Sequence, residues 1–476
     1  MSYTAIPSEI TFNDLNRMGS LSPSMYQKIV RVNGYSKKVR KLIEPSQKGV
    51  EVGGNAYVED SDFKFIRTSA LQEFSYLIIR DTRSILSVKP KAFINANMRQ
   101  WQILYAKDSN IGECSILESS DYSKYMFSSG ILKLSVKESP LYLFAFLKHP
   151  FLKEQVLKDV SKGATIRHSK LKILDCLIPF PKQKNGDEVV VHIEDLIKSI
   201  VDKEVLIRRK HGLILSLIDK ELRDKQKPMP FHYESPKLKE IRQRGRLDTS
   251  LYTEQFKRLW HRIVNYADGY DSILKLGYTP VRGPNLAISE IGRSIYTETP
   301  LKGFYELIRP TNITEWGTLV KKEYLGNKRE LQLVNKGAII IGCEGYEKGR
   351  SLVLLDDMNR CTTNFHATAL TKEDSKVIDV VFVRCFLAYL REIGMVDMIG
   401  VGGSGGHFAP EYFDLVLVPN FPENVKERVA RLYHNPNAQS DQEQQGIYQL
   451  NADILNTKQE LWRIQEKIIR GSEVSL

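Results

Sequence analysis

Apolar residues recur at every seventh position in two stretches of the chain. The first stretch runs from Val189 to about Lys227 and carries Ile193, Ile200, Ile207 and Ile214. The second lies near the C-terminus and carries Ile447, Ile454, Leu461 and Ile468. A seven-residue repeat kept over several helical turns predicts a helix that supercoils around a partner. Since the chain has to return on itself for the two stretches to meet, we expect them to pair as an antiparallel coiled coil.

Shorter patterns fill the rest of the chain and predict a mixed α/β (α+β) fold. Runs of β-branched and aromatic residues, separated by turn residues, predict strands in the first half at Phe63–Ile66, Tyr76–Ile79, Trp101–Tyr105, Ile131–Leu134 and Leu171–Ile178. Similar runs in the second half predict strands at Ile273–Leu276, Tyr305–Ile308, Gly337–Ile341, Leu352–Leu355 and Leu415–Val418. Helical spacing of apolar residues predicts one helix in each half, at Pro140–Val160 and Val377–Glu392.

Several landmarks occur twice, in the same order. Gly-Ser-Leu-Ser-Pro-Ser-Met-Tyr from Gly19 matches Gly-Arg-Leu-Asp-Thr-Ser-Leu-Tyr from Gly245, and Ile-Arg at Arg67 matches Ile-Arg at Arg309. The stretch from Gly163 through His168 to Pro181 matches the one from Gly403 through His407 to Pro422. We therefore expect two tandem domains of similar fold, each followed by a long helix. The predicted boundaries are 1–188 for the first domain with a basic N-terminal arm, 189–230 for the first spacer helix, 231–422 for the second domain and 423–476 for the second helical spacer region.

Composition narrows the class of partner. The 476 residues carry a formal net charge of +12, which favours a polyanionic partner. The five cysteines are scattered and form no Cys-x-x-Cys pair, so the sequence indicates neither a disulfide framework nor a zinc site and fits a reducing cytosol. The N-terminus lacks the pattern of a secretory signal, and we expect no contact with a membrane.

Polar and basic residues in loops are the candidates for contact with DNA. Loops held on a rigid sheet can present Arg, Lys, Asn, Ser and His side chains to base edges and phosphates. These candidates are Arg67, Lys107, Asn110, Arg167, His168, Arg309, Lys348, Arg350, Ser404 and His407. In this interpretation, the loop Lys107–Asn110 of the first half corresponds to Glu347–Arg350 of the second. The alternative for every candidate is a structural role in its loop. The Gly402–Gly406 run is likewise either a flexible turn before a strand or a loop whose N–H groups approach a DNA phosphate.

Two polar residues flank the first heptad series. Glu204 and His211 each lie four residues after an isoleucine of the repeat. They are either solvated residues at the edge of the helix or residues that fix its register.

Motifs for catalysis are missing from the sequence. It contains no Gly-x-x-x-x-Gly-Lys-Ser/Thr, no Asp/Asn-Pro-Pro-Tyr and no His-Glu-x-x-His, and no convincing nuclease triad. We therefore expect a chain without catalytic residues, bound metal or cofactor of its own.

The arrangement resembles the specificity (S) subunit of type I restriction-modification enzymes. The residues that carry the resemblance are Gly245-Arg246-Leu247-Asp248 with Tyr252, the Ile-Arg pair in each half, and Gly163 followed by Ile178-Pro179-Phe180-Pro181 before the first long helix. The chain departs from the family in its long basic N-terminal arm and in the Gln/Asn-rich break at Asn435–Gln445.

The resemblance implies a division of labour between subunits. Each domain would be a target recognition domain for one part of a bipartite site in double-stranded DNA. The helices would form a spacer and dock two methyltransferase (M) subunits, which use S-adenosylmethionine. Restriction (R) subunits would join them and use ATP and Mg, in defence of a prokaryotic cytoplasm against foreign DNA. Two alternatives stay open: a specificity subunit of a type IIB or IIG-like system, and a stand-alone DNA-binding regulator.

Overall fold

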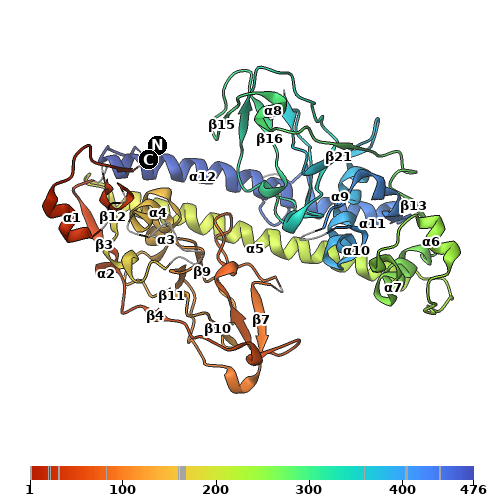
Figure 1. Cartoon of the computed structure of the whole chain (residues 1–476), viewed down its shortest axis with the longest axis horizontal. Helices are drawn as coiled ribbons and strands as arrows, with labels where there is room; N and C mark the ends of the chain where they lie inside the picture. Colours follow the sequence, from red (N-terminus) through yellow and green to blue (C-terminus); the bar gives the residue numbers. More distant parts are fainter. Residues whose placement is uncertain are drawn as a thin grey trace. The chain divides into compact units, whose positions relative to one another are not determined.

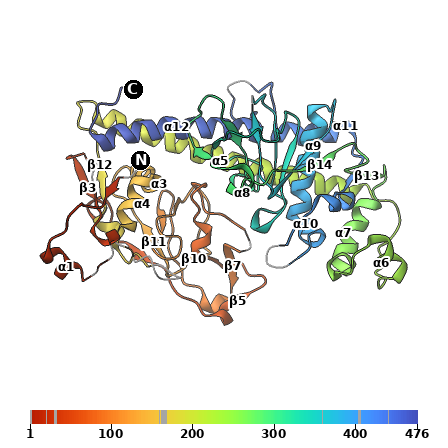
Figure 2. The same ribbon diagram turned by 45° about the horizontal axis from the view of Figure 1, so that its top comes forward.

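Two units share the long helices of this chain. The computed structural model describes the whole chain except residues 1–2, 20, 22, 30–32, 82, 159, 161–167, 359, 403–405, 439–440 and 476. Unit 1 consists of Met1–Glu204 with Asn456–Leu476, and unit 2 consists of Val205–Leu455. The helices α5 (Gly186–Asp224) and α12 (Ile447–Arg470) therefore each run from one unit into the other (Figure 1, Figure 2).

Unit 1 contains a small antiparallel sheet of β1 (Thr4–Ala5) and β2 (Lys28–Ile29), and three further sheets organise it. Their strand orders are β10–β6–β7–β5, β4–β11–β8–β9 and β12–β3. The strands of the first sheet are β10 (Tyr125–Phe127), β6 (Lys64–Ile66), β7 (Ile85–Val88) and β5 (Tyr57–Val58). Those of the other two are β4 (Gln47–Lys48), β11 (Ile131–Leu134), β8 (Ile103–Ala106), β9 (Cys114–Ile116), β12 (Leu177–Pro179) and β3 (Ser36–Lys38). Since β8 and β11 are buried at every position, they carry apolar residues on both faces.

Unit 2 repeats these three sheets strand for strand. Its orders are β20–β16–β17–β15, β14–β21–β18–β19 and β22–β13. The strands of the first sheet are β20 (Cys361–Thr362), β16 (Tyr305–Leu307), β17 (Tyr324–Gly326) and β15 (Ile295–Thr297). The others are β14 (Thr279–Arg282), β21 (Ala367–Thr371), β18 (Ile339–Gly342), β19 (Ser351–Val353), β22 (Leu417–Pro419) and β13 (Tyr270–Ser272). The β10–β6 and β20–β16 pairs are parallel and the other pairs in these sheets are antiparallel, so the predicted duplication is confirmed.

Two of the repeated sequence landmarks have the same structure in both units. Gly19 and Gly245 each end a helix, α1 (Phe12–Met18) and α6 (Leu238–Arg244), in the left-handed conformation with φ of 58° and 63°. Glycine adopts this conformation without the strain that a Cβ atom causes. Arg67 and Arg309 each precede a 3₁₀ turn, η3 (Thr68–Ala70) and η7 (Pro310–Asn312), so their predicted correspondence is confirmed.

A second pair of equivalent glycines went unnoticed in the sequence. The amide of Gly49 donates to Ile131 O at 3.2 Å, and that of Gly283 donates to Ala367 O at 3.0 Å. A Cβ atom on Gly49 would lie 2.2 Å from the carbonyl oxygen of Ser128. One on Gly283 would lie 2.3 Å from the carbonyl oxygen of Asn364. Both positions therefore need glycine because another part of the backbone passes too close for a side chain.

The predicted helices are confirmed in unit 2 and corrected in unit 1. Helix α9 (Val377–Glu392) has the predicted bounds and contacts β19. The helix predicted at Pro140–Val160 is instead two helices, α3 (Pro140–Lys148), which contacts β9, and α4 (Pro150–Leu157). Pro150 cannot continue the first helix, and the Nδ1 atom of His149 accepts a hydrogen bond from the amide of Phe151 at the start of the second.

Three strand predictions were wrong over most or all of their length. Tyr76–Ile79 is buried but irregular, since the amides of Tyr76 and Leu77 donate to a helix carboxylate rather than to a strand. Ile273–Leu276 is a turn after β13, closed by the hydrogen bond from Leu276 N to Ser272 O at 3.0 Å. Most of the stretch predicted at Leu171–Ile178 is the 3₁₀ helix η5 (Lys172–Asp175), and only its end belongs to β12.

The two ends of the chain meet in unit 1. The hydroxyl of Tyr3 donates to the carboxylate of Glu466, and the amide of Asn33 donates to Ile469 O at 3.0 Å. In unit 2 the last turns of α5 take the corresponding place, where Tyr266 donates to Glu221 at 2.9 Å. Each unit is thus completed by the C-terminal end of one long helix.

The heptad positions form the buried side of both helices. All eight are at most 3% exposed, namely Ile193, Ile200, Ile207, Ile214, Ile447, Ile454, Leu461 and Ile468. Within unit 1 the two helical segments run antiparallel, because His192 contacts Glu460 at 3.2 Å while Gln183 bonds to Val474 at 2.7 Å. Helix α5 has 39 residues and is about 58 Å long at ~1.5 Å per residue.

The second helical region is interrupted, as expected. It consists of α11 (Glu423–Tyr433), which packs against α9, and α12 after the Gln/Asn-rich break. Glu204 and His211 on α5 are only 6% and 8% exposed, so the interpretation as solvated residues was wrong. In the part of the chain that the structure describes, no helix has the length and apolar character needed to cross a membrane.

Gly49→Ala is predicted to destabilise unit 1 by about 3 kcal/mol, because its methyl group would meet backbone oxygens that cannot move away independently. Gly53→Ala is the matched control, since a Cβ atom there meets nothing within 4 Å and the φ angle is −71°. Urea unfolding of the two variants measures the difference. Equal midpoints would contradict the packing described for Gly49.

His149 should make stability depend on pH. Burial lowers the pKa of His149 to about 4 from the ordinary value of 6.5, so the unfolded chain binds the proton first as the pH falls. Its contribution is therefore present above pH 6.5 and is lost toward pH 4, by about 2 kcal/mol at pH 5. His149→Asn keeps an acceptor at the start of α4 and should reduce the loss of unfolding free energy between pH 7 and pH 5. An unchanged pH profile in this variant would count against the assignment.

Candidate nucleic-acid interface

A carboxylate and a histidine meet at the end of a central strand in unit 1. β8 ends at Ala106, and two residues later Asp108 pairs with His168, whose Nδ1 atom lies 2.9 Å from the carboxylate. The backbone holds them together because Ser169 N donates to Lys107 O at 2.9 Å. The His168 side chain is 61% exposed and that of Asp108 is 14% exposed. The pair therefore presents an imidazole to solvent in a fixed orientation.

The same pair occurs at the same place in unit 2. β18 ends at Gly342, and two residues later Glu344 pairs with His407, whose Nδ1 atom lies 3.2 Å from the carboxylate. The amide of Phe408 donates to Cys343 O at 2.7 Å, as Ser169 does in unit 1. The predicted correspondence of His168 with His407 is therefore confirmed.

Glu344 collects further partners that Asp108 lacks. His366 Nδ1 lies 2.5 Å from one of its oxygens, and the Arg282 guanidinium lies 2.9 Å from the other. His366 occupies the position of Gly130 in unit 1, since Cys343 N donates to its carbonyl as Lys107 N donates to that of Gly130. The two units thus carry one shared pair and different neighbours around it.

The structure corrects the predicted match between the two polar loops. Gly112 N donates to Ala106 O at 3.1 Å, and Gly349 N donates to Gly342 O at 2.8 Å, so these two glycines correspond. Lys107–Asn110 therefore corresponds to the stretch that begins at Cys343, and not to Glu347–Arg350. The prediction was wrong because the loop in unit 2 is one residue longer than that in unit 1. In addition, Glu344 follows the uncharged Cys343, whereas Asp108 follows Lys107, so the two loops do not look alike in sequence.

Arg67 and Arg309 occupy equivalent positions but have different partners. The Arg309 guanidinium binds the buried Glu323 through two hydrogen bonds, at 2.9 and 2.5 Å, and Glu323 also accepts one from Asn312 at 3.0 Å. Arg67 is exposed and donates to the carbonyl of Arg83 at 3.2 Å. Among the described residues no carboxylate lies within ion-pair distance of Arg67, so its charge faces solvent.

Unit 2 has an open pocket beside these groups. Its volume is about 750 Å³. It is lined by Arg309, Pro310, Thr311, Glu344, Gly345, Glu347, Asn364, His366, Val401, Gly402, Gly406 and His407. On the corresponding face of unit 1, Asn110 donates from Nδ2 to Thr68 O at 3.4 Å, which places it beside the turn that follows Arg67. Each unit therefore gathers several of its predicted site residues on one face.

The other predicted residues lie in different settings. Lys107 is 9% exposed and pairs with Asp108. Lys348 and Arg350 are 7% and 5% exposed; Lys348 pairs with Asp397 at 3.0 Å, and Arg350 donates to Ile313 O at 3.2 Å. These three charges are neutralised or bonded inside the protein, which favours a structural role. Arg167 and Ser404 lie outside the described residues.

Sequence reading missed the acids of this site. Asp108 and Glu344 each follow a fully buried four-residue strand by two positions, and that spacing was visible as a signal. Within the described part of the chain, no three His, Cys, Asp or Glu side chains are placed to hold a metal ion.

Comparison with known proteins gives only distant structural likenesses. No protein-family model matches the chain, and no curated protein matches its sequence. A crystal structure of the S subunit of a type I restriction-modification system from M. genitalium aligns with 94% of this chain and 97% of its own, at 12% identity and a TM-score of 0.37. A chain from a study of complex assembly and conformational transition in the type I system aligns with 93% and 100%, at 14% identity and 0.30. The HsdS subunit from Thermoanaerobacter tengcongensis aligns with 92% and 97%, at 14% identity and 0.29.

Removal of the two equivalent arginines should affect stability differently. Arg309→Ala is predicted to lower the unfolding free energy by about 2–3 kcal/mol, because it leaves the buried Glu323 carboxylate with one donor instead of three. Arg67→Ala should change it by less than about 0.5 kcal/mol, since Arg67 is exposed. Denaturant unfolding of both variants tests this pair. A similar loss in both would mean that Arg67 has a structural partner after all.

Proposed function

We propose that this chain is the DNA-recognition subunit of a type I restriction-modification complex, and that each unit reads one part of a bipartite DNA site. The observation that carries the proposal is the face found once in each unit, with the same fold beneath it and different side chains upon it. Two equivalent readers with different chemistry suit a site whose two parts differ in sequence.

The side chains of the two faces suit contact with base edges. Arg67 and Asn110 in unit 1 carry donors of the kind that bind guanine and adenine in the major groove. In unit 2 the Arg309 side chain is held by Glu323, so the exposed edges of His366 and His407 are the groups most accessible for a base or phosphate. The net charge of +12 adds attraction to the phosphate backbone that is independent of sequence.

The long helices give the proposal its geometry. A continuous helix of 39 residues runs from one unit into the other, about 58 Å in all. Readers connected in this way suit half-sites separated by about one turn of DNA. Two methyltransferase subunits would dock on the chain, and restriction subunits would join through them. S-adenosylmethionine, ATP and Mg would be bound by those partners, and this chain would carry no catalytic residue.

The test is co-expression with a cognate methyltransferase (M) subunit, followed by sequencing of the methylated sites. We expect methylation at one asymmetric split site, and little binding or methyl transfer by the chain alone. Arg67→Ala should relax the preference at one base pair of one half-site, by about 1–3 kcal/mol, because a base contact is lost. Arg83→Ala serves as a matched control for loss of a neighbouring charge.

Three results would contradict the proposal. Methylation at sites that are not split into two parts would contradict the recognition of a bipartite site. Failure to copurify with any methyltransferase would favour a stand-alone regulator. DNA cleavage or methyl transfer by the purified chain alone would show that it has catalytic residues.

A further inference from the structure

One loop in each unit lies against the long helices. In unit 1 this docking loop is residues 72–77, and in unit 2 it is residues 314–319. The two loops correspond because a backbone amide just after each one donates to the last residue of the preceding 3₁₀ turn. Ile79 N donates to Ala70 O at 2.8 Å, and Val320 N donates to Asn312 O at 2.9 Å. The docking loop therefore follows directly on the turn that begins after Arg67 or Arg309.

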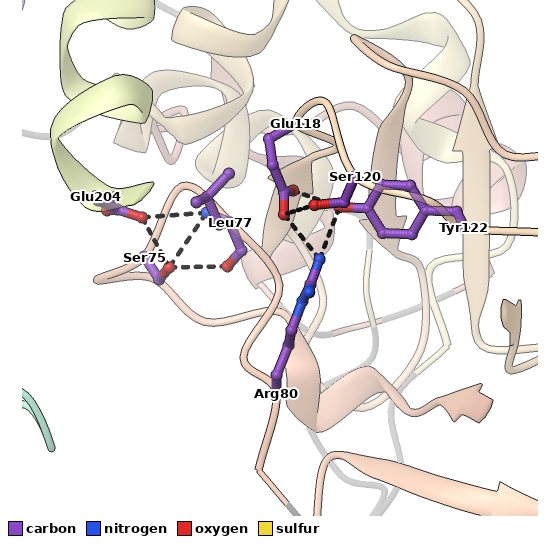
Figure 3. A network of polar contacts seen from close by, with 7 residues as sticks. All are labelled: Ser75, Leu77, Arg80, Glu118, Ser120, Tyr122 and Glu204. Carbon is purple, nitrogen blue, oxygen red and sulfur yellow. Dashed lines mark hydrogen bonds and ion pairs between the residues drawn. The ribbon is translucent and has the colours of Figure 1, made fainter. Parts of the chain in front are cut away.

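In unit 1 a buried carboxylate of α5 holds the docking loop. Glu204 lies 3.1 Å from the Ser75 hydroxyl and accepts a hydrogen bond from Leu77 N at 3.3 Å (Figure 3). It also accepts one from Tyr76 N at 3.0 Å. The single hydroxyl hydrogen of Ser75 is shared between Glu204 and Leu77 O, which lies 2.8 Å away, and the Ser75 oxygen accepts from Leu77 N at 3.2 Å, so the loop is closed on itself around the carboxylate. Hydrogen bonds to an ionised acceptor are stronger than neutral ones, particularly where water is excluded.

A cation from α12 holds the same loop from another side. Lys458 donates to Phe74 O at 3.4 Å, and its Nζ atom lies 5.0 Å from the centre of the Tyr76 ring. Burial lowers the pKa of Lys458 to about 8. Lys148 of α3 lies 5.5 Å from the same ring and donates to Gln72 O at 2.8 Å. The Tyr76 ring is thus bound by cations while its amide is bound by Glu204.

In unit 2 the two helices exchange these roles. Asn451 of α12 pairs with the backbone of Leu319, accepting from its amide at 2.8 Å and donating to its carbonyl at 3.0 Å. Arg208 of α5 lies 4.8 Å from the Trp316 ring. A polar side chain on one helix and a cation on the other therefore hold each docking loop, and the helix that supplies each group differs between the units.

We propose that Glu204 and Asn451 are positioning residues, which fix each recognition face on its helix and so set the length of the unspecified gap between the half-sites. This inference rests on the proposed function. Its physical basis is the short covalent path from Arg67 to Ser75 and from Arg309 to Leu319. A docking loop released from its helix can shift, and the recognition face beside Arg67 or Arg309 shifts with it, while the side chains that would meet the bases stay the same.

The variants replace one hydrogen-bonding atom each. Glu204→Gln puts an NH₂ group against donors, and Asn451→Asp puts an oxygen against the carbonyl of Leu319. The controls make the same type of change on the same helices: Asp202→Asn, at a carboxylate paired with Lys198, and Asn456→Asp, at an exposed side chain. Each variant is assembled with the methyltransferase subunit and given duplexes whose gap is one base pair shorter than, equal to or one base pair longer than the natural gap.

We expect Glu204→Gln and Asn451→Asp to lose about ten-fold of the discrimination between gap lengths, a factor that corresponds to about 1.4 kcal/mol. Base preference within both half-sites should be unchanged, which a general loss of stability would not produce. The two controls should keep the natural gap preference.

Unchanged gap discrimination in both variants would overturn the inference, and so would a change of base preference with the gap preserved. If Glu204→Gln does not fold, Ser75→Ala takes its place, because it removes one donor and leaves both amides; an unchanged gap preference there has the same meaning. The wild-type complex separates the two proposals. If the wild-type complex recognises no split site, the proposed function is wrong. If it recognises a split site and the variants keep the same gap preference, only the positioning role is wrong.

Discussion

The apolar stripe of α5 is the constraint on which the rest of the structure depends. A helix of 39 residues with an isoleucine at every seventh position has to cover that stripe along its whole length. Each unit covers a part of it: Ile193 and Ile200 lie in unit 1, Ile207 and Ile214 in unit 2. The returning helix α12 has the same property in the opposite order. Unit 1 is accordingly built from two separate pieces of the chain, Met1–Glu204 and Asn456–Leu476.

The two units share their backbone arrangement and differ in the side chains around the carboxylate–histidine pair. Gly49 and Gly283 are fixed because backbone oxygens lie where their side chains would be. The turn after Arg67 and Arg309 is fixed by its own hydrogen bonds. The groups around the carboxylate–histidine pair differ between the units, since His366 and Arg282 contact Glu344 whereas Lys107 pairs with Asp108. Gly130 in one unit and His366 in the other occupy the same position with different chemistry. Under the proposed function, such a change would alter the recognised sequence without altering the fold.

The sequence predicted the features that repeat or that depend on local periodicity. The heptad stripe, the duplicated order, α9 and the match of Arg67 with Arg309 all follow from patterns within short stretches. Features that depend on distant residues could not be obtained in this way. The irregular course of Tyr76 and Leu77 is set by Glu204, more than a hundred residues later, and the burial of Lys348 and Arg350 follows from partners on α10 (Met395–Ile399) and from the loop after η7. Their charges looked available because charge alone does not reveal a partner.

The exchange of roles between the helices has a consequence for how recognition and spacing could evolve. In unit 1 the carboxylate comes from α5 and the cation from α12; in unit 2 the amide side chain comes from α12 and the cation from α5. Each helix therefore supplies the polar contact of one unit and the cation–ring contact of the other from different residues. A substitution at one of these residues changes the contact in one unit only. The contacts that hold each docking loop can therefore change independently of those in the other unit. Under the proposed function, a two-part site would require such independence, because either half could then be replaced without disturbing the other.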